Sequence, residues 1–163
     1  MIGIIKRHRT KVSSGERKEK VPVFDIKYAL KVAKEYYDEK TFHHAMRVAG
    51  YVTQDNLIPK EKMNNCIILA MMHDLLEDTD YVFPIYSDTD EEEWYINNCL
   101  ELLTRDKRNS TYETYLQKIK EEYKNYPEAY WVKLADMKDH LTQTDTLTDK
   151  LKDKYLTALP YLL

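Results

Sequence analysis

Four ionisable side chains lie within six consecutive residues, directly after a strongly apolar segment. Residues 66–72 read Cys-Ile-Ile-Leu-Ala-Met-Met, and the six residues that follow are His73-Asp74-Leu75-Leu76-Glu77-Asp78. An imidazole and several carboxylates in such a place repel and desolvate one another unless a cation or a hydrogen-bond network compensates them. A bound divalent metal ion would do so, and it would also activate water for hydrolysis.

One helix end cannot surround a metal ion, so further ligands must come from other parts of the chain. His44 lies 29 residues before His73 in a predicted helix, and Asp136 lies in the apolar segment 131–136, where an unpaired carboxylate is costly. Two imidazoles and two carboxylates suit Mn²⁺, Fe²⁺ or Zn²⁺ better than Ca²⁺. Taken singly, His44 has the simpler interpretation of a packed or surface histidine, and Asp136 that of a partner of Lys133.

These residues resemble the pattern of the HD superfamily of metal-dependent phosphohydrolases, in which a His is followed by a His-Asp pair and by a distant Asp. The similarity runs from about residue 28 to residue 141. Within the superfamily the chain looks most like the hydrolase domain of RelA/SpoT proteins and the small stand-alone (p)ppGpp hydrolases. Three segments carry the resemblance, the second most specifically: His44-Ala45-Met46-Arg47-Val48-Ala49-Gly50, His73-Asp74-Leu75-Leu76-Glu77-Asp78-Thr79 and Val132-Lys133-Leu134-Ala135-Asp136.

The resemblance implies a metal site, a catalytic pair and a reaction. The metal would be Mn²⁺, or another divalent transition metal such as Fe²⁺ or Zn²⁺, held by His44, His73, Asp74 and Asp136. The residues that orient the attacking water and transfer its proton would be Glu77 and Asp78. The implied activity is hydrolysis of a nucleotide polyphosphate, with (p)ppGpp 3′-pyrophosphohydrolase activity as the first candidate. The alternatives are a nucleotidase or dNTP phosphohydrolase of this superfamily, and an HD module that binds a nucleotide without hydrolysing it.

The chain departs from the RelA/SpoT branch at positions that contact substrate. Relatives in that branch carry an Asn four residues after the last metal Asp. In this chain that residue is His140. Because His140 lies one helical turn after Asp136, it is expected to face the same site. They also carry basic residues eight or nine positions before the first ligand His, where this chain has Glu35 and Tyr36. We expect His140 to contact the substrate, and the base of the nucleotide stays open.

A cluster of cations is the expected contact for the phosphates. Arg105, Lys107 and Arg108 place three cations in four residues at a predicted helix junction of an otherwise acidic domain, where they can meet a polyanion. A solvated turn is the alternative interpretation. We therefore expect Arg105, Arg108 and Lys133, together with His140, to bind the substrate.

The composition predicts an all-α fold. The 163 residues are 43% hydrophobic, enough for one core, and only 3 Gly and 5 Pro disfavour an all-β architecture. Cys66 and Cys99 lie in apolar helical patterns and form no CxxC motif, so we interpret them as buried thiols. We expect a compact HD-domain bundle of about seven helices, with a long loop at 78–90 and helices at 26–38 (capped by Asp25), 41–54 (capped by Thr41), 60–76, 91–104, 111–124, 127–144 and 148–159.

Charge is distributed unevenly along the chain. Residues 1–24 hold seven Lys or Arg against two Glu and so carry +5, whereas the remaining residues carry −8, which gives the chain its net charge of −3. We therefore divide the chain into a basic N-terminal arm (1–24) and a phosphohydrolase domain (25–163). The acidic domain argues against nucleic-acid binding, and no segment is apolar for long enough to span a bilayer or to form a signal peptide. The sequence predicts a cytoplasmic protein that binds a nucleotide, with no membrane or nucleic-acid partner and an undefined oligomeric state.

Overall fold

A computed structural model describes residues 24–84 and 90–163, which are helical apart from turns and loops and contain no strand. A four-residue helix, α4 (Leu75–Asp78), and a 3₁₀ turn, η1 (Glu122–Lys124), accompany seven longer helices: α1 (Ile26–Tyr36), α2 (Glu39–Thr53), α3 (Lys60–Met72), α5 (Glu91–Leu103), α6 (Tyr112–Glu121), α7 (Pro127–Thr142) and α8 (Asp149–Leu162). The predicted all-α bundle of seven helices is confirmed. The basic arm, apart from Phe24, lies outside the described residues.

Side-chain caps decide where the first two helices begin. Asp25 caps α1 as predicted, because its carboxylate accepts a hydrogen bond from the Tyr28 backbone N–H at 2.8 Å. The expected cap of the second helix was wrong. Asp38 caps α2 by accepting from the Thr41 backbone N–H at 2.7 Å, so Thr41 lies inside the first turn. The earlier start also places Glu39 in that turn, where its charge complements the helix dipole.

The helix predicted at 60–76 is broken at the His-Asp pair. α3 ends at Met72, and His73 and Asp74 form a turn before α4 begins. The Asp74 backbone N–H donates to the Tyr37 hydroxyl at 3.2 Å instead of to a helical carbonyl. Neighbouring side chains of a continuous helix point about 100° apart. In this turn, by contrast, His73 Nε2 and Asp74 Oδ2 come within 3.2 Å of each other.

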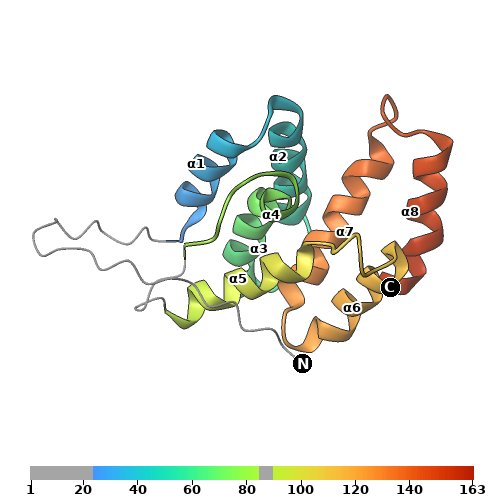
Figure 1. Cartoon of the computed structure of the whole chain (residues 1–163). Helices are drawn as coiled ribbons and strands as arrows, with labels where there is room; N and C mark the ends of the chain where they lie inside the picture. Colours follow the sequence, from blue (N-terminus) through green and yellow to red (C-terminus); the bar gives the residue numbers. More distant parts are fainter. Residues whose placement is uncertain (1–23, 85–89) are drawn as a thin grey trace, which may run out of the picture.

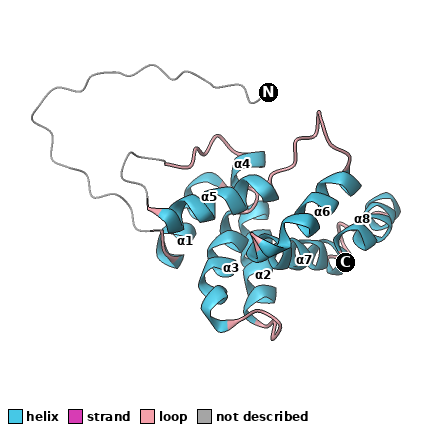
Figure 2. Cartoon of the chain, turned by 90° about the horizontal axis from the view of Figure 1, so that it is seen from below, coloured by secondary structure: helices cyan, strands magenta, loops and turns pink. Residues whose placement is uncertain are grey.

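α3 lies in the middle of the bundle, where it packs against α1, α2, α5 and α7 (Figure 1). α7 also packs against α2, and α6 pairs with α8 on the far side of α7 (Figure 2). A single hydrophobic cluster runs through the described residues and includes Leu69, Leu100, Leu116 and Met137. No helix in the described part of the chain is both long and apolar enough to cross a membrane. This packing holds α2, the α3–α4 turn and α7 against one another.

Both cysteines are buried and free, as predicted. Burial raises the pKa of Cys66 to about 12, and burial likewise raises that of Cys99. Because only the thiolate reacts, a raised pKa leaves both buried thiols almost entirely in the unreactive protonated form at pH 8. We therefore expect Ellman's reagent to modify neither thiol within minutes in the native protein and both of them in guanidinium chloride, as followed by absorbance. Rapid modification of the native protein would contradict this burial.

Candidate metal centre

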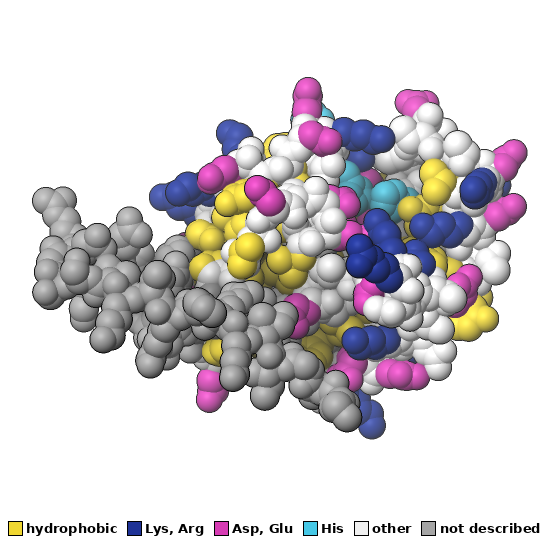
Figure 3. Space-filling model, viewed as in Figure 1, with side chains coloured by type: hydrophobic (Ala, Val, Ile, Leu, Met, Phe, Trp, Pro, Cys, Tyr) yellow, Lys and Arg dark blue, Asp and Glu magenta, His cyan; other side chains and the backbone are white. Residues whose placement is uncertain are grey.

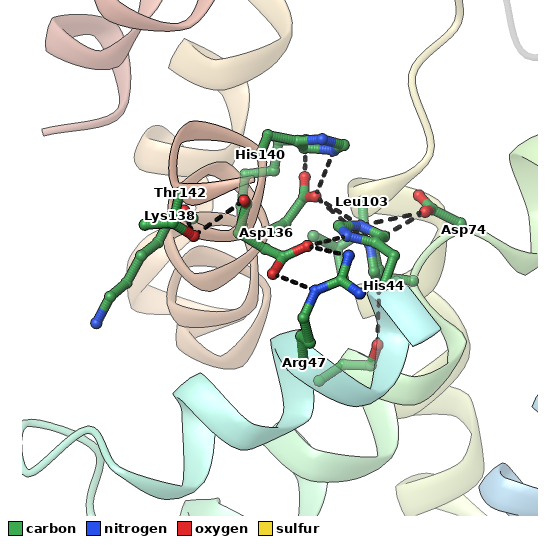
Figure 4. Close-up of polar contacts among 12 residues, drawn as sticks. His44, Arg47, Asp74, Leu103, Asp136, Lys138, His140 and Thr142 are labelled. Carbon is green, nitrogen blue, oxygen red and sulfur yellow. Dashed lines mark hydrogen bonds and ion pairs between the residues drawn. The ribbon is translucent and has the colours of Figure 1, made fainter. Parts of the chain in front are cut away.

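The four side chains predicted as metal ligands come from α2, the α3–α4 turn and α7. Figure 4 shows His44, Asp74 and Asp136 from these three places directed toward one another. His44 Nε2 lies 3.1 Å from Asp136 Oδ1 and 3.2 Å from His73 Nε2. Asp74 Oδ2 lies 3.2 Å from His73 Nε2 and 3.7 Å from His44 Nε2, and His73 Nε2 lies 3.7 Å from Asp136 Oδ1. Bonds of about 2.1 Å place adjacent ligand atoms about 3.0 Å apart in an octahedron and about 3.4 Å apart in a tetrahedron. These separations suit neighbouring ligands of an ion, and the candidate ligands fall into two groups that share His44, one with His73 and Asp74 and the other with Asp136 and His140.

Hydrogen bonds determine which nitrogen of each imidazole faces this cluster. His44 Nδ1 donates to Asp139 Oδ2 at 2.7 Å, and His73 Nδ1 donates to the Ala70 carbonyl at 2.8 Å. Because both partners can only accept, the Nε2 atom of each neutral ring carries a lone pair. Lone pairs of two imidazoles and two carboxylates thus converge, and the buried Asp136 Oδ1 makes no hydrogen bond among the described residues. A metal ion would accept these lone pairs, so the residues fit a metal ion.

The charges of the cluster also favour a cation. Burial works against the charged form of His73, but the carboxylates of Asp74 and Asp136 outweigh it and hold the pKa of His73 well above its ordinary value. The cluster thus attracts positive charge to His73 Nε2, where a metal ion would take the place of a proton. Burial would likewise raise the pKa of Asp136, whereas Lys133 and His140 hold the pKa of that carboxyl well below its usual range. Asp136 is therefore ionised at neutral pH.

Lys133 positions the Asp136 carboxylate. Its Nζ donates to Asp136 Oδ2 at 2.6 Å, and it lies 5.5 Å and 5.2 Å from the ring centroids of Tyr112 and Tyr115. One carboxylate oxygen is thus occupied by Lys133, and the other is left for the cluster. Lys133 therefore pairs with Asp136, which was one of the two interpretations of the sequence. Lys133 also lines a pocket, as expected for a residue that binds the substrate.

Asp139 and Arg47 support His44 and were not found from the sequence. Asp139 is fully buried, and its two oxygens accept from Arg47 Nε at 2.8 Å and from Arg47 Nη2 at 3.0 Å, in addition to His44 Nδ1. Burial opposes the charge of Asp139, but Arg47 and His44 together lower its pKa. The available signal was spacing, since Arg47 follows His44 by three residues and Asp139 follows Asp136 by three, which places each pair on one helix face.

We expect Asp139→Asn to weaken metal binding by about 10- to 100-fold, because a carboxylate that holds the distal nitrogen of a ligand histidine fixes its orientation and raises its basicity. Competition with a chromophoric chelator measures the affinity. Asp145→Asn, an exposed change on the loop after the same helix, serves as the matched control. Equal metal affinities of the two variants would show that Asp139 does not support the ligand.

His140, predicted to contact the substrate, lies within reach of the cluster. Its Nε2 lies 3.1 Å from Asp136 Oδ1. Its ring stacks on Tyr155, with the ring centroids 5.1 Å apart, and makes a tilted contact with the His44 ring, with the centroids 4.6 Å apart. His44, Asp136 and His140 form a second group of donors whose ligand atoms lie within 4.8 Å of one another. His140 is therefore a further candidate ligand as well as a neighbour of the substrate.

A pocket of about 220 Å³ opens beside the cluster, with Asp74, Asp136 and His140 in its wall. Figure 3 shows Lys and Arg side chains gathered next to the exposed His atoms on this face. The predicted acidic pair also lines the pocket. Glu77 Oε1 pairs with Lys107 Nζ at 2.7 Å, while Asp78 faces this pocket and a second one described below. Burial, and then the negative charges of Asp74 and Glu77, raise the pKa of Asp78.

The three cations predicted to meet phosphate do not share one location. Arg105 and Lys107 line the pocket, and Arg105 Nη2 donates to the Ser110 carbonyl at 2.9 Å, which holds the 105–110 turn. Arg108 is exposed and lines neither pocket. Lys154 of α8 lines the pocket instead, and no motif in the sequence indicated it.

A second pocket, of about 170 Å³, lies on the other side of His44 and Asp139. Its remaining walls come from the start of α2 and from the loop after α7, and they include Lys40, Gln143 and Thr146. Glu35 and Tyr36, which stand where relatives carry basic residues, line neither pocket. The cluster therefore lies between two pockets, of which the larger contains more cations.

Comparison of the chain with protein-family models, curated proteins and solved structures finds no match in any of the three. The resemblance to HD phosphohydrolases thus rests on the motif residues. The structure itself establishes an all-α bundle whose His and Asp side chains could hold a metal ion.

Proposed function

We propose that this protein is a metal-dependent phosphohydrolase of nucleotide polyphosphates, with (p)ppGpp as the first candidate substrate. The observation that carries the proposal is the direct contact between the His and Asp cluster and a pocket that holds both carboxylates and cations. A metal site alone would serve many functions. A metal site beside a cationic pocket and a separate acidic pair suits the hydrolysis of an anionic ester or anhydride.

The donor residues and the acidic pair have different roles in this proposal. His44, His73, Asp74 and Asp136 hold the ion, with His140 as a further candidate. When bound, a transition-metal ion lowers the pKa of water and polarises a phosphoryl oxygen. Asp78 accepts the proton of the attacking water, because a carboxyl whose pKa is raised towards neutrality is a better general base.

Cations in the pocket support a phosphate-containing substrate over a neutral one. Arg105 and Lys107 lie on the turn after α5 and line the same pocket as Asp74 and Asp136. Guanidinium and ammonium groups compensate the charge of phosphate and hold it by charge-assisted hydrogen bonds. Lys107 also pairs with Glu77, so it links the acidic pair to the cationic side of the pocket.

The test is product release by Mn²⁺-loaded protein from ppGpp, a dNTP and a nucleoside monophosphate, separated by ion-exchange chromatography. GDP and pyrophosphate from ppGpp are expected. Triphosphate from the dNTP, or phosphate from the monophosphate, would instead support the other hydrolases of the superfamily. Tight nucleotide binding without any product would support a binding module, and activity unchanged in His73→Ala would overturn the proposed site.

We expect Asp78→Asn to lower kcat by about 10²- to 10⁴-fold while the protein still binds one equivalent of metal, because proton transfer is lost and the ligand atoms are kept. Asp80→Asn, an exposed change two residues away, is the matched control and should leave kcat unchanged. Metal content is measured on the same samples. An equal kcat for Asp78→Asn and wild type would exclude Asp78 as the base.

A further inference from the structure

Several cations of the larger pocket surround one tyrosine ring. Lys154 Nζ lies 4.4 Å from the Tyr112 centroid, Lys133 Nζ lies 5.5 Å from it, and Arg105 Cζ lies 5.8 Å from it. They come from α8, α7 and the turn after α5, and Tyr112 begins α6. Three positive charges are thus gathered by tertiary packing from segments far apart in the sequence.

These cations differ in what compensates them. Lys133 has the Asp136 carboxylate. The Arg105 guanidinium donates only to the Ser110 carbonyl and carries no ion pair in the described chain, although the Arg105 backbone N–H donates to Glu77 Oε2 at 3.4 Å. Lys154 Nζ is likewise within ion-pair distance of no carboxylate in residues 24–84 and 90–163, and its contacts are with the Tyr112 and Tyr155 rings. Lys154 is an exposed residue at the wall of the pocket, where partial desolvation and the nearby Arg105 and Lys133 lower its pKa. Two positive charges in this pocket therefore lack a negative partner.

The Tyr112 hydroxyl is a donor without an acceptor. The residue is 8% exposed, lines the pocket, and its hydroxyl oxygen makes no hydrogen bond among the described residues. Burial raises the pKa of Tyr112 to about 12, so the hydroxyl keeps its proton at neutral pH. A buried donor without an acceptor is unfavourable, and an anion bound in the pocket offers one.

We propose that Arg105, Tyr112 and Lys154 form an anion subsite that takes a phosphoryl group other than the one placed at the metal cluster. This subsite presents positive charges and a hydroxyl donor, which suit an anion. The His and Asp cluster instead presents lone pairs, which suit a cation. A substrate with phosphoryl groups at both places must contain at least two of them. This inference rests on the proposed function for its catalytic meaning, and it assigns the substrate to the di- and polyphosphates rather than the monophosphates.

The test is pyrophosphate binding to metal-free protein by isothermal titration calorimetry, since no ion is then present to chelate the probe. We expect Lys154→Met to raise the Kd for pyrophosphate by about 10-fold, the effect of losing one charge-assisted contact, and Tyr112→Phe to raise it by about 3-fold. Lys152→Met, exposed on the same helix, should bind as wild type does. Circular dichroism melting verifies that each variant is folded.

Absence of pyrophosphate binding, or an unchanged Kd in folded Lys154→Met, would overturn the subsite. The result is separable from the proposed function, because binding is measured without metal or turnover. Binding that depends on Lys154 supports the subsite even where no nucleotide is hydrolysed. Conversely, if Lys154→Met hydrolysed a polyphosphate substrate with the same KM as wild type, the proposed activity would stand and the proposed subsite would be refuted.

Discussion

His44→Ala is expected to abolish metal binding and hydrolysis together. His44 Nε2 lies within 3.7 Å of the ligand atoms of His73, Asp74 and Asp136, and His44 belongs to both groups of candidate ligands within the described chain. The remaining three side chains would then lack the ligand that lies between them, so the metal content should fall from about one equivalent to less than about a tenth of an equivalent. Hydrolysis should fall with it, by about 10³-fold or more.

The adjacent histidine provides the matched control. His43 is exposed and about 100° away on the helix, so His43→Ala should keep both the metal and the activity of wild type. Metal is measured by mass spectrometry after dialysis, and product release by chromatography. Retention of stoichiometric metal by His44→Ala would refute the metal centre, and loss of metal in both variants would show that the effect is not specific to His44.

Lys133→Met is expected to give the largest loss of stability. Lys133 is buried, and its ammonium donates to the buried Asp136 carboxylate at 2.6 Å. Removing one member of a buried ion pair leaves the other charge uncompensated, which costs about 3–5 kcal/mol. Methionine keeps most of the side-chain volume, so the change measures charge more than packing.

A bound ion should reverse part of that loss, because it places positive charge at the same carboxylate. We expect Mn²⁺ to raise the stability of Lys133→Met by more than the ~2.7 kcal/mol that a ligand at 100 times its Kd confers. Urea unfolding with and without Mn²⁺ measures both quantities. Lys138→Met, exposed on the same helix, should match wild type. An equal effect of Mn²⁺ on Lys133→Met and wild type would show that the ion does not bind at Asp136.

The helices and the donor types could be predicted from the sequence because they are local properties. Apolar residues at helical spacing, few glycines and capping side chains determined seven long helices to within a few residues. The cost of placing Asp136 and the His73-Asp74 pair in apolar segments indicated a cation site. The error at Thr41 arose because Asp38 and Thr41 are both good caps and spacing does not distinguish them.

Only the tertiary structure decided how these groups meet. The turn at His73 and Asp74 is held by the hydroxyl of Tyr37, the residue that follows α1, and His44 is supported by Asp139 of α7 and Arg47 of α2. The anion subsite joins Arg105, Tyr112 and Lys154 from three segments. Local periodicity tells which face of a helix is buried, but not which residues of another helix lie opposite. The sequence alone therefore determined the helices and the kinds of ligand, and packing determined which atoms converge and what charge each pocket presents.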